Sequence, residues 1–133
     1  MCGRFVSATP PDQIAQYFGA EEVSEAVLEP NWNVAPTTDV YTVLESKGVR
    51  RLEPVHWGLV PFWAKDVKVG NRMINARVET LAEKSAFKRP FEKRRCIIPV
   101  ERWNSALSST TIVAVISSPC SIARTTNTES TLE

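Results

Sequence analysis

The sequence predicts an α+β domain, and three observations lead to that prediction. Several short segments are rich in β-branched and apolar residues, and turns containing Pro, Gly or Ser separate them. Few stretches have the apolar spacing of a helix, and these are short. Strands and helices do not alternate along the chain as they would in a doubly wound parallel sheet.

The chain is expected to begin with a short strand and a helix. The strand covers residues 3–7. Thr9 is expected to cap a helix that continues to Phe18, and Gly19 is a natural stop for it. A second short helix is expected over 21–28.

Most of the remaining elements are expected to be strands. Residues 40–45 and 49–59 should form a hairpin, because Ser46-Lys47-Gly48 separates two apolar runs. The other expectations are an irregular segment at 31–37, a loop at 61–70, strands at 73–78, 96–100 and 110–117, and a helix at 80–87.

Length and composition fit one globular domain. The chain has 133 residues, of which 43% are hydrophobic, too many for a disordered chain. The 16 Lys and Arg residues nearly balance the 15 Asp and Glu residues, which argues against a histone-like polybasic protein but leaves room for a local basic face. No run is apolar enough to cross a membrane or to act as a signal peptide.

Cysteine usage indicates a reducing environment. Cys2, Cys96 and Cys120 cannot all pair, and none has the CxxC spacing of a zinc site. We therefore expect a cytoplasmic, intracellular protein with no metal and no cofactor.

Composition changes near residue 104. Residues 1–103 hold all the tryptophans, whereas residues 104–133 are rich in Ser and Thr and contain no aromatic residue. We expect an ordered part over 1–103 and a divergent tail over 104–133, with disorder over 124–133.

Cys2 offers the most distinctive chemistry. Removal of Met1 would leave an amine and a thiol on adjacent carbons, and such a pair can capture an aldehyde as a Schiff base that closes to a thiazolidine ring. Both groups titrate near neutrality, at about 7.7–8.0 for the amine and about 8.5 for the thiol. The alternative is an incidental cysteine at the end of the chain.

Other residues are suited to nucleic acid. Asn75 and Arg77 would share one face of a strand, where an amide and a guanidinium can hold a carbonyl and a phosphate. Residues 84–102 interleave basic and aromatic side chains, which suits single-stranded DNA. The alternatives are a polar strand face and a solvated charged helix.

The remaining aromatic and histidine residues leave alternatives open. Trp57, Phe62 and Trp63 cluster around Gly58 and Pro61, where aromatic rings can form a base-stacking platform or belong to the core. Trp57 is expected in the core, whereas Trp63 is equally suited to the core and to stacking on a base. His56 is the only histidine, and it is expected to be structural rather than a catalytic base.

Five motifs together resemble one family. MCGRF at 1–5, WNVAPT at 32–37, WGLVPFWAKD at 57–66, INARVET at 74–80 and RRCIIPV at 94–100 follow in this order. The combination is similar to the SOS response-associated peptidase (SRAP) family of abasic-site processing proteins. The resemblance implies a curved, barrel-like antiparallel sheet with a few short helices. It also implies a monomer that acts, in association with the nucleoid, on single-stranded DNA containing abasic sites.

The resemblance also assigns roles to residues. It implies that Met1 is removed and that Cys2 forms the thiazolidine with the ring-opened aldehyde of an abasic site, while Asn75 holds the linkage. The DNA-binding residues that it implies are Arg4 and Arg77 at phosphates, Asn33 in the same pocket, and Trp63 in a loop against unstacked DNA.

The chain departs from the family pattern after residue 100. Ser105 stands where the catalytic Glu is expected, Ala106 replaces a Trp, and the family's later histidine has no counterpart. We therefore expect a truncated or frameshifted product without the usual acid–base groups, and an incomplete fold. Three hypotheses follow: a DNA-crosslinking protein, an inactive fragment or noncovalent single-stranded DNA-binding remnant, and a cysteine peptidase with His56 as base.

Overall fold

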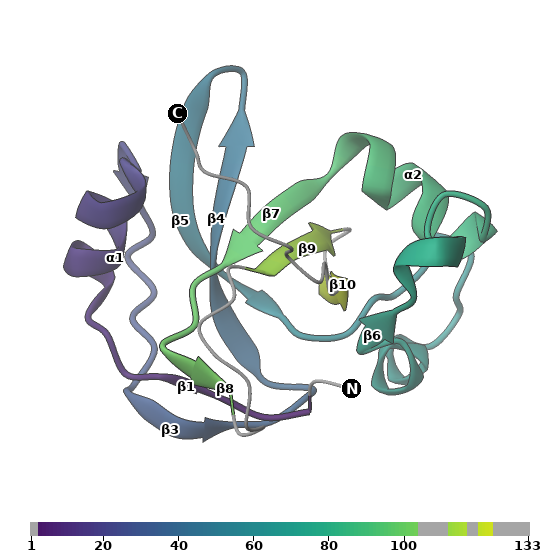
Figure 1. The fold of residues 1–133 in the computed structure, drawn as a ribbon, viewed down its shortest axis with the longest axis horizontal. Coiled ribbons are helices and arrows are strands. Elements are labelled where there is room, and N and C mark those ends of the chain that lie inside the picture. Colours follow the sequence, from purple (N-terminus) through teal and green to yellow (C-terminus); the bar gives the residue numbers. More distant parts are fainter. Residues whose placement is uncertain (1–2, 104–111, 117–119, 124–133) are drawn as a thin grey trace.

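The part of the chain that the structure describes forms two sheets and two α-helices (Figure 1). The computed structural model describes residues 3–103, 112–116 and 120–123. A three-stranded sheet has β1 (Phe5–Ser7) between β3 (Asn31–Val34) and β8 (Arg102–Trp103). The other sheet has the order β2 (Glu22–Val23), β5 (Val49–His56), β4 (Asp39–Ser46), β7 (Arg95–Ile98), β9 (Ile112–Ile116), β10 (Cys120–Ala123) and β6 (Asn75–Ala76).

The predicted α+β class is confirmed, but the expected barrel-like antiparallel sheet is not. Within the described residues, the seven-stranded sheet stays open, because β2 and β6 lie at its opposite edges. It is also a mixed sheet, since β2 pairs in parallel with β5 and β10 pairs in parallel with β6. The other pairings are antiparallel.

The β4–β5 hairpin that the sequence predicts is confirmed. Its turn is Lys47-Gly48, and both residues have positive φ, at 55° and 80°. Two such residues form the tight turn whose twist matches that of the strands. The second strand ends at His56, three residues earlier than expected.

Alternate side chains of β4 enter two different cores. Val40 packs with Phe5 and Trp57, whereas Tyr41 and Val43 pack under the first helix. Both faces of the strand are therefore covered, and this explains why the consecutive residues 40–43 of β4 are all buried.

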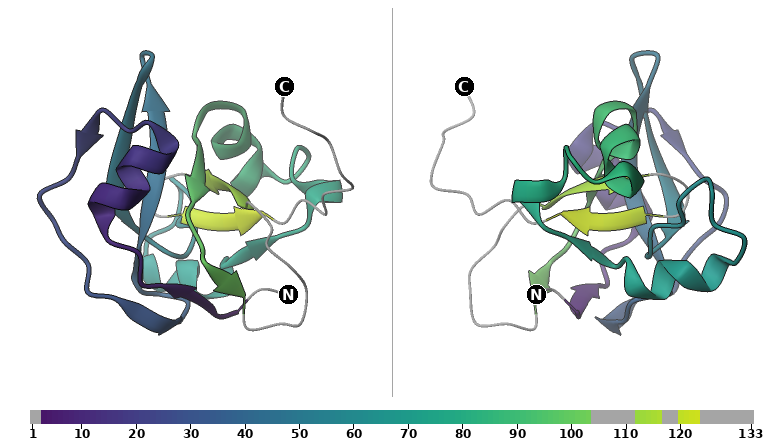
Figure 2. Two further views of the ribbon diagram at one scale, coloured as in Figure 1. Left: turned by 60° about the vertical axis from the view of Figure 1, so that its left-hand side comes forward. Right: turned by 90° about the vertical axis from the view of Figure 1, so that its right-hand side faces the viewer.

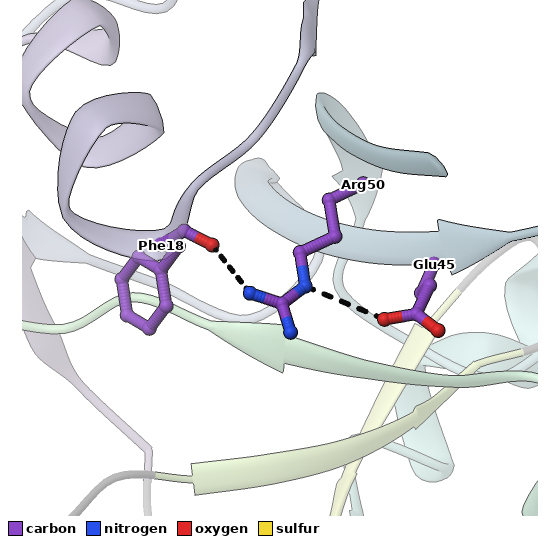
Figure 3. A network of polar contacts seen from close by, with 3 residues as sticks. All are labelled: Phe18, Glu45 and Arg50. Carbon is purple, nitrogen blue, oxygen red and sulfur yellow. Dashed lines mark hydrogen bonds and ion pairs between the residues drawn. The ribbon is translucent and has the colours of Figure 1, made fainter. Parts of the chain in front are cut away.

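The first helix, α1 (Pro11–Phe18), starts later than predicted. Its N-cap is Pro10, with no side-chain cap, because the hydroxyl of Thr9 donates instead to Glu101. The predicted stop is confirmed, since Gly19 adopts a left-handed conformation with φ of 62°. Arg50 ties this end to the hairpin, because its Nη1 donates to the Phe18 carbonyl (3.0 Å), as Figure 3 shows.

Two other predictions before the hairpin are wrong. Residues 21–28 form no helix, because Glu21 and Ser24 donate backbone hydrogen bonds to β5 and β2 lies between them. The segment 31–37, expected to be irregular, contains β3, which pairs with β1. In both places a neighbouring strand supplies hydrogen bonds that local sequence does not reveal.

Several boundaries after the hairpin also differ. Part of the expected loop is a 3-10 helix, η1 (Val67–Arg72), and the strand expected over 73–78 is only β6, followed by the 3-10 turn η2 (Val78–Thr80). The helix expected at 80–87 is α2 (Ser85–Lys93), which buries Phe87 and Pro90. Pro90 lies beyond the first turn, a position where proline removes a helical hydrogen bond.

The residues described after position 103 form two strands. The strand expected over 110–117 is present as β9, and β10 was not predicted. The predicted disorder of 124–133 lies outside the described residues. Figure 2 shows α1 beside the β4–β5 hairpin, whereas α2 lies beside β7 and β9.

Candidate functional site

Strand pairing brings Arg4 and Asn33 together. Phe5 pairs with Val34 across β1 and β3, and both side chains enter the same core, with 0% and 2% of their surface exposed. Their neighbours Arg4 and Asn33 are exposed, as the alternation of side chains along a strand requires. Arg4 Nη1 donates to the Asn33 carbonyl oxygen at 3.5 Å.

A β-bulge shapes this part of β3. Phe5 pairs with Val34 and Ser7 with Asn31, so β3 uses one more residue than β1 over the same span. The Asn31 side chain accepts the Asn33 backbone N–H at 2.9 Å. Bulges redirect side chains and are common beside functional sites.

Trp57 connects this pair to the strand that carries Asn75. Its ring is fully buried and lies 5.2 Å from the Phe5 ring, centroid to centroid. Its indole Nε1 donates to the Ile74 carbonyl oxygen at 3.0 Å. Ile74 packs against the same core as Phe5 and Val34. Arg4 and Asn33 each directly precede a residue of this core, and Asn75 directly follows one. The predicted core position of Trp57 is confirmed.

A close approach of two glycines fixes the segment before β6. A Cβ on Gly58, whose φ is 149°, would lie 2.8 Å from the Gly70 carbonyl oxygen. Just beyond this contact, the backbone N–H of Leu59 donates to the Met73 carbonyl at 3.1 Å. Glycine is required at position 58 because a side chain would both collide and strain the backbone.

Asn75 and Arg77 do not share a strand face as predicted. β6 ends at Ala76, so the alternation of a strand does not extend to Arg77. Asn75 is half-buried, and its backbone pairs with Ile122 of β10. Arg77 is exposed at the start of the following turn.

Trp63 is the remaining predicted site residue that the structure describes. Trp63 is 55% exposed in the segment between β5 and η1, which favours a surface role over the core alternative. Cys2, Ser105 and Ala106 lie outside the described residues. Gly3, next to Cys2, is exposed, and a Cβ there would meet no described atom within 4 Å.

Glu101, directly before β8, is joined to the segment that follows β1. Its Oε1 accepts hydrogen bonds from the backbone N–H of Ala8 (2.7 Å), and from the N–H and the hydroxyl (2.6 Å) of Thr9. The Thr9 hydroxyl, followed by these backbone donors, lowers the pKa of the Glu101 carboxyl below its ordinary value. This contact holds the segment that follows β1.

His56 is placed against a carboxylate on the hairpin. Its Nδ1 lies 3.2 Å from Asp39 Oδ1, and both side chains are exposed. The pairing favours the structural role expected for this histidine. Over residues 3–103 and the two later strands, no group of three or more His, Cys, Asp or Glu side chains could hold a metal ion.

Trp32 escaped the sequence reasoning, whereas Phe62 belongs to the aromatic cluster for which both the core and base stacking were open. Trp32 is 71% exposed in the bulged strand beside Asn33, and Phe62 is 84% exposed next to Trp63. The signal was present in the motifs, since each aromatic adjoins a predicted site residue. Exposed large aromatic side chains commonly mark binding surfaces.

Comparison with known proteins decides the family. The family model described as SOS response associated peptidase (SRAP) matches residues 1–105. The chain belongs to the SRAP family. The motifs identified above therefore carry a genuine family relationship.

Several SRAP relatives are named for one activity. The abasic site processing protein YoqW of Bacillus subtilis (strain 168) is 43% identical over 104 residues, covering 77% of this chain and 46% of YoqW. The abasic site processing protein YoaM of the same strain is 40% identical over 116 residues, covering 84% and 51%. The abasic site processing protein YedK of Escherichia coli (strain K12) is 37% identical, covering 77% and 46%. The chain thus spans about half the length of these relatives.

Solved structures support the fold. A crystal structure of a protein from Bacteroides thetaiotaomicron matches with a TM-score of 0.67 and 21% identity, covering 85% of this chain and 53% of that one. A phage-related protein from Bordetella bronchiseptica matches with a TM-score of 0.67 and 18% identity, covering 92% and 68%. Among the described residues, no helix is long and apolar enough to span a membrane.

Proposed function

We propose that this chain binds single-stranded DNA at abasic sites and forms a covalent crosslink through Cys2 after Met1 is removed. The observation that carries the proposal is the shared core of Phe5, Trp57 and Ile74, which supports Arg4 and Asn75 from two distant parts of the chain. The names of the SRAP relatives support abasic DNA as the substrate. The protein acts as a monomer in the cytoplasm, associated with the nucleoid.

The covalent chemistry needs only the N-terminal residue and the sugar aldehyde. The α-amine of Cys2 attacks the aldehyde carbon, and loss of one water gives a Schiff base. The thiol then adds to the same carbon, a C–S bond forms, and the thiol proton passes to nitrogen. Hydrolysis of the Met1–Cys2 peptide bond must come first, because an amide nitrogen cannot form the Schiff base.

The other site residues hold the DNA around this reaction. Arg4 and Arg77 are exposed guanidiniums that pair with phosphates on either side of the lesion. Asn75, half-buried on β6, directs its amide to the opened sugar, and Asn33 lines the same pocket. Trp63 stacks against an unstacked base.

The proposal is tested with an oligonucleotide that carries one abasic site. Protein of verified N-terminus should give a heat-stable adduct whose intact mass is the sum of both components less one water. Cys2→Ala keeps the amine, so it should give only a labile Schiff base that borohydride traps. Absence of any adduct with folded protein starting at Cys2 would refute the crosslinking activity.

The second candidate is noncovalent binding of single-stranded DNA. The exposed basic side chains of α2 and the aromatic residues Phe62 and Trp63 favour it, because none of them requires Cys2. This candidate predicts equal affinity for abasic and intact strands and a log affinity that falls with log salt by about 0.7 per phosphate contacted. A Cys2-dependent adduct would exclude it as the whole function.

A further inference from the structure

A groove lies between α2 and the segment after β5. Its walls are Phe62 on one side and Ser85, Ala86, Arg89 and Arg94 on the other, with buried prolines at its base. Arg89 lies one turn after Ser85 and Ala86, so these three residues form one stripe of α2, and Arg94 is the C-cap of the helix. The backbone N–H of Arg94 donates to the Pro90 carbonyl at 2.7 Å. This hydrogen bond fixes the backbone at the end of the helix, from which the Arg94 side chain extends.

The groove combines an exposed ring with cations that have no acidic partner among the described residues. Phe62 is 84% exposed, a costly position for a phenyl ring. The ion pairs of the described residues use Arg50, Arg51 and His56, so Arg89 and Arg94 remain without one. None of the described residues that line the groove is acidic.

A small core places this groove next to β6. Leu59, Leu81 and Phe87 are buried together, and both Ala76 and Ala86 pack against them. Ala76 lies between Asn75 and Arg77, while Ala86 lines the groove. A DNA strand that binds Arg77 therefore has to cross only the width of this core to reach α2.

We infer that the groove between Phe62 and α2 binds a nucleotide of the same DNA strand, away from the lesion. The base stacks on the Phe62 ring, and Arg89 and Arg94 bind the flanking phosphates. Stacking on a ring and pairing with phosphates read no particular base, so the groove accepts any sequence. This inference extends the proposed function from one lesion pocket to a continuous track for single-stranded DNA.

The test measures noncovalent binding, so it does not depend on crosslinking. A fluorescein-labelled, undamaged oligo-dT is titrated by anisotropy at several salt concentrations. Phe62→Leu should weaken binding about fivefold or more, because it removes one stacking partner. Arg89→Gln combined with Arg94→Gln should weaken binding and reduce the salt slope by about 1.4, which is 0.7 for each phosphate lost.

Lys47→Gln is the control for the loss of an exposed charge, because it removes one at the hairpin tip, on a different element. It should leave both affinity and slope near those of the unchanged protein. Unchanged binding in the folded groove variants, or equal losses in the control, would overturn the inference. Capture of labelled oligoglutamate in place of oligo-dT, with the same dependence on the two arginines, would overturn it too and indicate an acidic protein partner.

Loss of crosslinking has a different signature from loss of the groove. If the groove alone fails, the adduct with abasic DNA still forms, at the same protein concentration as before. If the crosslinking proposal fails, the adduct is absent, yet the groove variants still change the anisotropy result.

Discussion

The two regions that carry the candidate site are held in different ways. Arg4 and Asn33 lie on β1 and β3, where backbone pairing and the buried residues Phe5 and Val34 fix their positions. Asn75 lies on a strand of two residues, which depends on the Trp57 indole hydrogen bond to Ile74 and on the pairing with β10. One region is supported by its own strands and the other by distant contacts.

This difference shows which substitutions should disrupt both regions and which should disrupt only one. Removing part of the shared core should unfold the protein, because both regions rest on it. Removing a single tie should instead displace Asn75 while leaving Arg4 and Asn33 in place.

Phe5→Ala should disrupt both regions at once. The ring is fully buried against Trp57, and its loss leaves a cavity, so the free energy of unfolding should fall by about 3–5 kcal/mol. Chemical denaturation measures this change. Phe62→Ala is the control, since that ring is exposed, and it should change stability by less than about 0.5 kcal/mol. Similar losses in both variants would contradict the shared core.

Trp57→Phe should release only the Asn75 region. The smaller ring still fills most of the core, but the Ile74 carbonyl loses its donor, at a cost of about 1–3 kcal/mol. Amide exchange should increase around β6 and stay unchanged in β1 and β3, and adduct formation should slow. Uniform protection across the protein would show that the indole does not position β6.

Glu101→Gln should loosen the end of β1 in a pH-dependent manner. The pKa of Glu101 is lowered in the fold, so its carboxylate stabilises the protein above the ordinary carboxyl range of about 4.3. That stability is lost as the pH falls through the folded pKa. Because the side chain is exposed, the difference at neutral pH should stay below about 1 kcal/mol. Denaturation at several pH values should show the two proteins converging in acid; a constant gap would contradict the carboxylate's role.

Thr37→Gly should slightly stabilise the loop after β3. Thr37 has a φ of 68°, and the left-handed conformation costs a branched residue about 1–2 kcal/mol. Glycine removes that strain but adds about 0.5–1 kcal/mol of chain entropy, so the net gain should be about 0.5–1 kcal/mol. Thr38→Gly is the control and should destabilise, because its hydroxyl donates to the Ala35 carbonyl at 2.7 Å. Thermal melting compares the two variants, and a lower melting temperature for Thr37→Gly would argue against the strain.

The sequence by itself determined the elements whose signals are local. The hairpin around Lys47-Gly48, the stop at Gly19 and the buried position of Trp57 follow from turn chemistry and apolar pattern within a few residues. The family motifs indicated the site residues Arg4, Asn33 and Asn75, and the structure joins Arg4 to Asn33 directly.

Only the tertiary structure decided how these parts meet. Thr9 and Glu101 are 92 residues apart, and their hydrogen bond moved the start of α1 away from its expected cap. β2, β3 and β6 form because other strands supply their hydrogen bonds, and the groove at Phe62 exists because α2 packs beside a distant loop. Contacts between residues far apart in the chain satisfy backbone groups and bury side chains, and no local pattern of sequence encodes which partners will do so.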